Sequence, residues 1–253
     1  MGREKFLVLC KSCLWCLCMV LFPAGSGILS AVFALNAIET LFLQGSFMLA
    51  SLVIPLIFVV TKKWKWSEIG FSEIDAGSWK KAAYFLPLLA IFVPAAWGGF
   101  EVSSAAYILG NLYLYLSVGI AEEVYFRGVI PKCLSRAFPL KSVIVLSAVI
   151  FGIGHIAAAF TASSGLEVLL TVINAVIFGW LAIEMTVICH NITPGILLHF
   201  LFDFETKIVR INGVELLTAE WLRGGIMVVA AVWLAARLKA KISDSKYREI
   251  TND

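Results

Sequence analysis

Two adjacent carboxylates and an arginine interrupt a long apolar stretch of this chain, in the segment AEEVYFRG at 121–128. Glu123 and Arg127 are four residues apart, so on a helix they share a face and can neutralise each other. Glu122 is rotated by about 100° from Glu123 around such a helix and has no partner at that spacing. An ion pair therefore accounts for Glu123 and Arg127, whereas Glu122 remains free for chemistry.

Two later apolar segments carry further groups that could act on a substrate. FGIGHI places His155 four residues after Phe151, and HFLFDF places His199 and Asp203 four apart on one helix face. A lone histidine in an apolar segment is more often a hydrogen-bonded core residue than a catalyst. Two histidines, an aspartate and an unpaired glutamate on three segments instead predict one shared polar site, suited to catalysis or to ion passage.

The composition places this site inside a membrane. Of the 253 residues, 60% are hydrophobic and 15% are charged, whereas soluble domains are about 45–50% apolar and about 25% charged. The apolar runs are too long, and too little alternating, for barrel strands. The sequence thus predicts an all-α, polytopic membrane bundle of about eight transmembrane helices with an intramembrane polar cavity, forming a single domain over 1–253.

The predicted spans cover 6–32, 44–61, 83–99, 105–128, 142–160, 167–187, 194–210 and 222–238. In the first part of the chain, 28–60 could instead hold two short helices, with Asn36 and Glu39 between them or in a re-entrant turn. On these boundaries Glu122 and His199 lie near the same ends of their spans. His155 then lies about 20 Å further in, a mismatch that a tilted helix, a later start of the span or a deep cavity must reconcile.

The distribution of lysine and arginine predicts the orientation, because these residues are enriched in cytoplasmic loops. Eight spans with both termini cytoplasmic put most cations inside, namely Arg3, Lys5, Lys62, Lys63, Lys65, Lys80, Lys81, Lys132, Arg136, Lys141 and the tail from Arg237 to Arg248. Only Lys207, Arg210 and Arg223 are left on the opposite face. In a prokaryote the membrane would be the plasma (inner) membrane. The net charge of +3 then reflects topology and anionic lipid rather than nucleic acid.

The three motifs, taken in order, resemble a known family. E-E-x-x-x-R at 122–127, F-x-x-x-H at 151–155 and H-x-x-x-[N/D] at 199–203 are similar to those of the CPBP intramembrane proteases. That family includes the CAAX prenyl endopeptidases of the Rce1 type and bacterial Abi proteins, which are linked to bacteriocin maturation and self-immunity. The resemblance covers about 115–206, the core domain of the family.

The resemblance implies a role for each matching residue. Glu122 would be the catalytic carboxylate that, with His155, holds and deprotonates a water, and Glu123 and Arg127 would support the site. His199 and the residue at 203 would stabilise the oxyanion. Prenyl endopeptidases typically have Asn there, whereas this chain has Asp203. Since an ionised Asp cannot donate a hydrogen bond, it would orient His199, and the prenylated nature of the substrate is left open.

The implied activity is hydrolysis of a peptide bond in a membrane protein or a lipidated peptide within the bilayer. We expect no cofactor, because a glutamate-activated water needs none and the chain has no H-E-x-x-H motif. Zinc is the alternative, with Glu122, His155 and His199 as its ligands. Two other functions use the same residues differently: a catalytically silent scaffold for a signalling or secretion partner, and a proton- or cation-coupled transporter.

Overall fold

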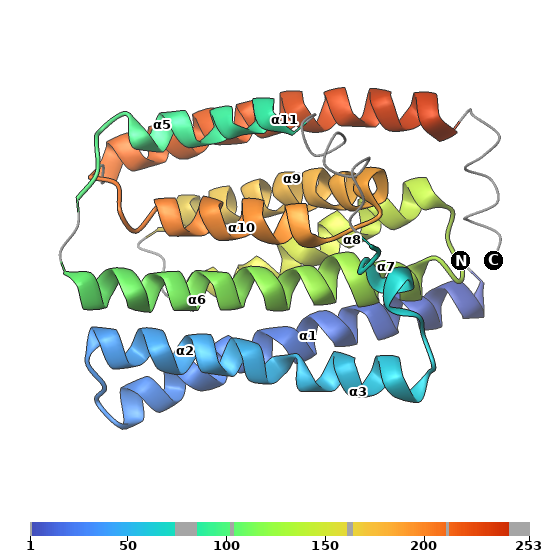
Figure 1. Cartoon of the computed structure of the whole chain (residues 1–253), viewed down its shortest axis with the longest axis horizontal. Helices are drawn as coiled ribbons and strands as arrows, with labels where there is room; N and C mark the ends of the chain where they lie inside the picture. Colours follow the sequence, from blue (N-terminus) through green and yellow to red (C-terminus); the bar gives the residue numbers. More distant parts are fainter. Residues whose placement is uncertain (1, 74–84, 102–103, 161–163, 211–212, 243–253) are drawn as a thin grey trace.

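The computed structural model describes residues 2–73, 85–101, 104–160, 164–210 and 213–242. Over these ranges the regular elements are helices, which lie side by side along the long axis of the molecule (Figure 1). The predicted all-α class is therefore confirmed. Lys80, Lys81, the start of the span expected at 83–99 and the tail from 243 lie outside the described residues.

The elements follow in this order: α1 (Arg3–Val32), α2 (Ala37–Ser51), α3 (Val53–Thr61), η1 (Trp66–Ile69), η2 (Leu86–Phe92), α5 (Val93–Ala96), α6 (Ala105–Glu123), η3 (Val124–Val129), α7 (Ile130–Leu134), α8 (Leu140–Gly154), η4 (His155–Phe160), α9 (Gly165–Cys189), α10 (Thr193–Glu205) and α11 (Gly213–Ile242). Here η3 is a π-helix and the other η elements are 3-10 helices.

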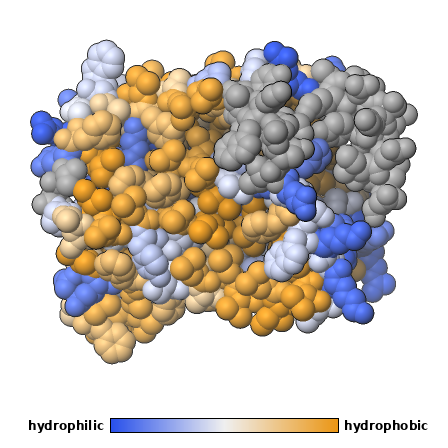
Figure 2. Space-filling model, viewed as in Figure 1, coloured by the Kyte–Doolittle hydropathy of each residue, from blue (hydrophilic) through white to orange (hydrophobic). Residues whose placement is uncertain are grey.

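Several of these helices suit a bilayer. Five helices of the described ranges are long and apolar enough to cross one: Arg3–Val32, Ala37–Thr61, Leu140–Ala157, Gly165–Cys189 and Leu217–Lys239. Figure 2 shows a broad apolar surface between more hydrophilic ends of the long axis, as expected where side chains face lipid. The chain is thus an integral membrane protein, while the count of about eight spans stays a prediction.

The region 28–60 forms the end of α1 followed by α2 and α3. Asn36 caps α2, because its side chain accepts hydrogen bonds from the N–H groups of Ile38 and Glu39. The Glu39 carboxylate in turn accepts from the N–H of Asn36 at 2.9 Å. This reciprocal capping box starts a helix. Asn36 and Glu39 therefore begin α2 instead of lying in a re-entrant turn.

The helix that carries the carboxylate pair is longer than the sequence predicted. α6 passes into the π-helix η3 and continues as α7, so the helical path runs from Ala105 to Leu134. Pro131 has no N–H to donate to the carbonyl of Arg127, four residues back, and this favours a shift of hydrogen-bond register at η3. Glu122 consequently lies well inside a helical run rather than near its end.

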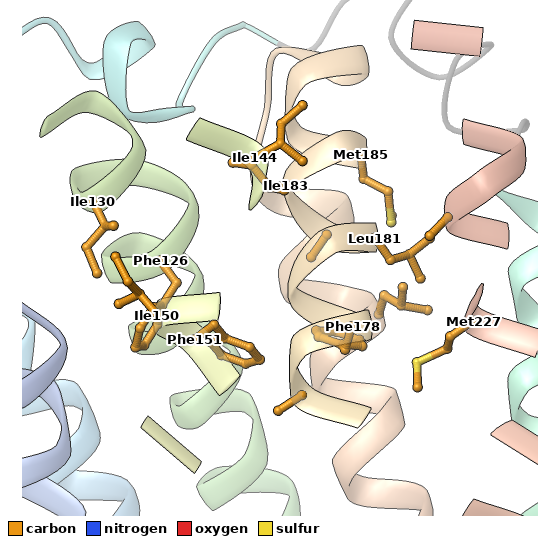
Figure 3. Packing of buried hydrophobic residues seen from close by; sticks show 14 of the residues in the cluster. Phe126, Ile130, Ile144, Ile150, Phe151, Phe178, Leu181, Ile183, Met185 and Met227 are labelled. Atoms are coloured by element: carbon orange, nitrogen blue, oxygen red, sulfur yellow. The ribbon is translucent and has the colours of Figure 1, made fainter. Parts of the chain in front are cut away.

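Small residues let the helices that bear the motifs approach closely, as is common in membrane bundles. A Cβ added at Gly119 of α6 would lie 3.1 Å from the Ile196 carbonyl oxygen of α10. A Cβ added at Gly152 of α8 would collide with Val176 of α9. The core beside these crossings is apolar, and Figure 3 shows Phe151 of α8 near Phe178 of α9, with ring centroids 6.3 Å apart.

The short segment 66–71, which contains η1, packs over the junction of η3 and α10. This junction lies at the end of the bundle where α1 begins and α11 ends (Figure 1). The N–H of Ile192 donates to the Gly70 carbonyl oxygen at 2.9 Å. Lys132 of α7 donates to Glu68 at 2.6 Å, which holds the pKa of the Glu68 carboxyl below its usual value. These contacts fix the start of α10 against the end of η3.

Candidate active site

α6 and α10 bring the carboxylate pair against His199. The Nδ1 atom of His199 lies 2.9 Å from Oε1 of Glu123, within hydrogen-bond distance. The same oxygen forms an ion pair with Nη1 of Arg127 at 3.0 Å, at the four-residue spacing read from the sequence. Glu123 thus joins Arg127 to His199 and fixes which nitrogen of the ring faces the rest of the site.

The opposite edge of the His199 ring faces two more carboxylates. Its Nε2 atom lies 3.7 Å from Oε2 of Glu122 and 3.6 Å from Oδ2 of Asp203. Both distances are too long for direct hydrogen bonds. Within the described part of the chain, Oε2 of Glu122 has no hydrogen-bond partner although it is buried. A small polar group could therefore be held between Glu122, His199 and Asp203.

Exposure separates the two sides of this site. The Glu123 side chain is fully buried, whereas the side chains of Glu122 and Asp203 are 15% and 28% exposed. The side of the site that a reactant can reach is therefore the side of Glu122 and Asp203. Glu123 and Arg127 lie behind it.

His155 is linked to the other residues of the site by its contacts with Phe151. Its Nδ1 atom lies 3.0 Å from the Phe151 carbonyl oxygen, and its ring packs against the Phe151 ring with centroids 4.6 Å apart. Phe151 in turn packs edge-on to His199 at 5.9 Å. The expected offset of about 20 Å is wrong, because the path from α6 to α7 extends past Glu122 and α8 returns antiparallel to it.

Aromatic rings surround the charge of Arg127. Its guanidinium lies 4.2 Å from the centre of the Phe151 ring and 5.6 Å from that of Phe178. Its Nη2 atom has no hydrogen-bond partner among the described residues. Cation–π contacts and the carboxylate of Glu123 therefore offset the cost of burying this cation. Phe151, the first residue of the F-x-x-x-H motif, contacts His155, His199 and Arg127.

Zinc is the alternative to a metal-free site. Among the described residues, no group of three or more His, Cys, Asp or Glu side chains is arranged to hold a metal ion. His199 directs Nδ1 to Glu123, and His155 directs Nδ1 to a carbonyl of its own helix, so each ring leaves Nε2 free of these contacts. Zinc-binding histidines commonly hold their second nitrogen in this way. Metal independence therefore stays a prediction.

The sequence did not indicate two contributions to the site. One is the direct contact of Glu123 with His199, since the residues are far apart in the chain and helix spacing relates only near neighbours. The other is Gly195: a Cβ at this position would lie 2.8 Å from Oε2 of Glu123. The signal for Gly195 was present in the turn segment NITPG, where a glycine follows the proline that opens α10.

One comparison with known proteins found a match. Residues 104–204 match the family described as type II CAAX prenyl endopeptidase Rce1-like. Searches of curated proteins and of solved structures found no match. The matched segment contains all three motifs, so the resemblance to the CPBP family is confirmed. At the level of the family, the match supports a CAAX-type intramembrane protease, a class that acts on prenylated proteins in membranes.

Proposed function

We propose that this protein is a glutamate-dependent, metal-independent intramembrane endopeptidase. The observation that carries the proposal is the convergence of Glu122 and Asp203 on Nε2 of His199, while Glu123 occupies Nδ1. Peptide hydrolysis needs a base for water and a donor for the developing oxyanion. A carboxylate oxygen without a partner and an oriented imidazole supply both.

In the proposed reaction, Oε2 of Glu122 accepts a proton from a water that attacks the scissile carbonyl carbon. His155 is the second group that holds this water. As an imidazolium, His199 donates from Nδ1 to the Glu123 carboxylate and from Nε2 to the oxyanion, and Glu123 keeps the ring in the orientation that this requires. The tetrahedral intermediate then collapses. Glu122 passes its proton to the leaving amide nitrogen, which restores the carboxylate.

Asp203 orients rather than donates in this scheme. Its carboxylate lies 3.6 Å from Nε2 of His199 on the exposed side of the site, where an asparagine could donate to the oxyanion directly. The proposed substrate is a lipid-modified or membrane-spanning protein or peptide, because the site lies inside an apolar bundle. A prenyl group is one such modification.

Cleavage of a fluorescence-quenched farnesylated CAAX peptide by purified protein in detergent tests the proposal. Glu122→Gln should lower kcat by at least about 10³-fold, since an amide cannot take the proton. Glu184→Gln is the matched control. Glu184 is a buried glutamate of α9 that accepts a hydrogen bond from Trp180 at 2.8 Å, and glutamine can still accept it. The control should cleave at the wild-type rate.

A strong chelator should leave the wild-type rate unchanged. Full activity of the Glu122→Gln protein would refute the assignment of the base. Loss of activity with chelator and its recovery with zinc would refute metal independence. The scaffold and transporter alternatives both require that the wild-type protein cleaves no peptide.

A further inference from the structure

A second buried charged cluster lies beside the candidate site, on helices α9, α10 and α11. Its centre is Arg223, which is fully buried although it is one of the largest side chains of the molecule. The sequence analysis counted Arg223 among the cations of the face opposite the termini, at the start of the span predicted over 222–238. In the structure α11 begins at Gly213, so Arg223 lies further inside a helix than predicted.

Arg223 contacts both its own helix and the last turn of α10. Its Nη1 atom donates to Oε1 of Glu220 at 2.8 Å, and its Nη2 atom donates to the carbonyl oxygen of Phe202 at 3.0 Å. Nη2 also lies 3.5 Å from Oε2 of Glu205. The guanidinium stacks on the Phe202 ring, with Cζ 3.6 Å from the ring centre. One side chain of α11 thus contacts α10 in three ways.

These contacts cap the C-terminal end of α10. The last four carbonyl groups of a helix have no partner within it, and a cation near that end is favoured by the helix dipole. α10 ends at Glu205, so the Phe202 carbonyl belongs to this last turn. The carbonyl of Asp203, in the same turn, accepts a hydrogen bond from the Thr206 hydroxyl at 2.7 Å. The turn that carries Asp203 is therefore held in part by a residue of another helix.

The anchor of Arg223 is itself fixed. Asn174 of α9 donates through Nδ2 to the side chain of Glu220 at 3.0 Å and to its carbonyl oxygen at 3.2 Å. A Cβ at Gly224 would lie 2.6 Å from Oδ1 of Asn174, so α9 and α11 are in close contact here. Since Glu220 cannot move freely, the position of the guanidinium is set by α9 and α11 together.

A series of ring contacts continues from this cluster into the site. The Phe202 ring that stacks on Arg223 also packs against Phe178, with centroids 5.4 Å apart. Phe178 packs against His199 at 4.9 Å. A shift of Phe202 would therefore disturb both Asp203, its neighbour in the chain, and the ring of His199.

We propose that Arg223 is a positioning residue for the reaction, which caps α10 and thereby sets the places of Asp203 and His199. The proposal rests on the proposed function. It adds a residue of α11, outside the segment 104–204 that matches the family. An apolar contact between α10 and α11 would pack them without the cost of burying Arg223 and Glu205, and the proposed positioning role would account for that cost.

The first test compares two arginines near the same end of the molecule. Arg223→Met should lower kcat for the farnesylated CAAX peptide by at least 10-fold while KM changes less than 2-fold. The control is Arg210→Met, because the Arg210 side chain is 65% exposed and lies in the connection after α10; it should leave both constants unchanged. Arg223→Lys, which retains a donor to the Phe202 carbonyl, should recover part of the lost kcat. Equal kcat for Arg223→Met and wild type would overturn the proposal.

A double-mutant comparison separates positioning from general stability. If Arg223 acts through Asp203, then Arg223→Met should lower kcat much less in an Asp203→Ala background than in the wild type. The same fold loss in both backgrounds would contradict the proposal. Should Arg223→Met fail to fold, Glu205→Gln weakens the same contact without removing the buried cation, and it should give a smaller loss confined to kcat.

Hydrogen exchange of the backbone amides over 203–209 provides a readout that does not need cleavage. Arg223→Met should accelerate exchange there at least 10-fold relative to wild type, and Arg210→Met should not. Unchanged exchange would refute the capping itself. If the wild type cleaves no peptide but exchange changes as stated, the proposed function fails while the capping of α10 by Arg223 stands.

Discussion

Glu123 connects the charged groups of the site, because one of its oxygens contacts both His199 and Arg127. Removing that carboxylate would leave the buried guanidinium without its counter-charge, which usually costs several kcal/mol. Glu122 differs, since its side chain is 15% exposed, whereas that of Glu123 is fully buried, and its Oε2 atom lies near Nε2 of His199 at 3.7 Å. Two neighbouring glutamates thus have separate tasks: Glu123 holds the site together and Glu122 faces the reactant.

This division predicts how substitutions on α10 rank. His199→Ala should lower kcat by about 10²–10³-fold, as expected for the loss of an oxyanion donor. Asp203→Ala should lower it less than His199→Ala does, and Asp203→Asn should be the mildest of the three. The reason is that asparagine can still orient His199 and can also donate to the oxyanion. The measurement is kcat of the three purified proteins on one peptide.

The order of the two Asp203 variants is the discriminating result. If Asp203→Asn were as inactive as Asp203→Ala, the negative charge at this position would be essential. Asp203 would then take part in proton transfer rather than in orientation.

At the scale of elements, the sequence predicted which segments form the helices that carry the motifs. It did not predict where along these helices the motif residues lie. Apolar length located the helical regions, and four-residue spacing found the pairing of Glu123 with Arg127. The same length criterion ended the predicted helix at 128. Instead η3 and α7 extend it to Leu134. Pro131 was the available signal, since proline can shift the register of a helix as well as end it.

The crossing of α6 and α10 gives a prediction for Gly195. A Cβ at this position would lie 2.8 Å from Oε2 of Glu123, so Gly195→Ala should displace that carboxylate and weaken its contact with His199. We expect kcat to fall at least about 10-fold, in the range that small misplacements in a site produce. The melting temperature should change little, because alanine favours a helix over glycine by about 0.5–1 kcal/mol.

Gly225→Ala serves as the control for this variant. Gly225 lies in α11, and a Cβ there would meet nothing within 4 Å. Its kcat should equal that of the wild type, and its melting temperature should be equal or slightly higher. A Gly195→Ala protein with wild-type kcat would show that Glu123 need not hold its present place.

At the scale of the whole molecule, charge statistics predict an orientation but did not indicate a buried ion cluster. Lysine and arginine counts assign each cation to one side of the membrane, and they do not indicate that the Arg223 side chain is fully buried. Its partners Glu205 and Phe202 are on another helix. Helix periodicity relates residues of one helix, and contacts between helices depend on how the bundle packs. The same limit concealed the contact between Glu123 and His199.

The turns of the structure provide positions at which the predicted orientation can be tested. We predict eight crossings with both termini cytoplasmic, from the excess of lysine and arginine on one face. Reporter fusions after Ala34, Gly99, Ser164 and Arg210 should report the outside, and fusions after Lys63, Phe138 and His190 should report the cytoplasm. These seven positions lie in turns or connections between helices. Each should carry both an enzyme active only outside and a fluorescent protein active only inside, so that every position gives one positive signal.

The pair Lys63 and Gly99 is the most stringent part of this test. The apolar helix between them, Leu86–Ala96, is short. With a rise of about 2.0 Å per residue in its 3-10 part and 1.5 Å in its α-helical part, it spans only about 20 Å of a hydrocarbon core about 30 Å thick. If it crosses with the help of flanking residues, the two fusions report opposite sides. If both report the cytoplasm, the segment does not cross and the eight-span topology is wrong. Gly99 and Arg210 should still report the same side, because the Arg210 N–H donates to the Gly99 carbonyl oxygen at 3.0 Å.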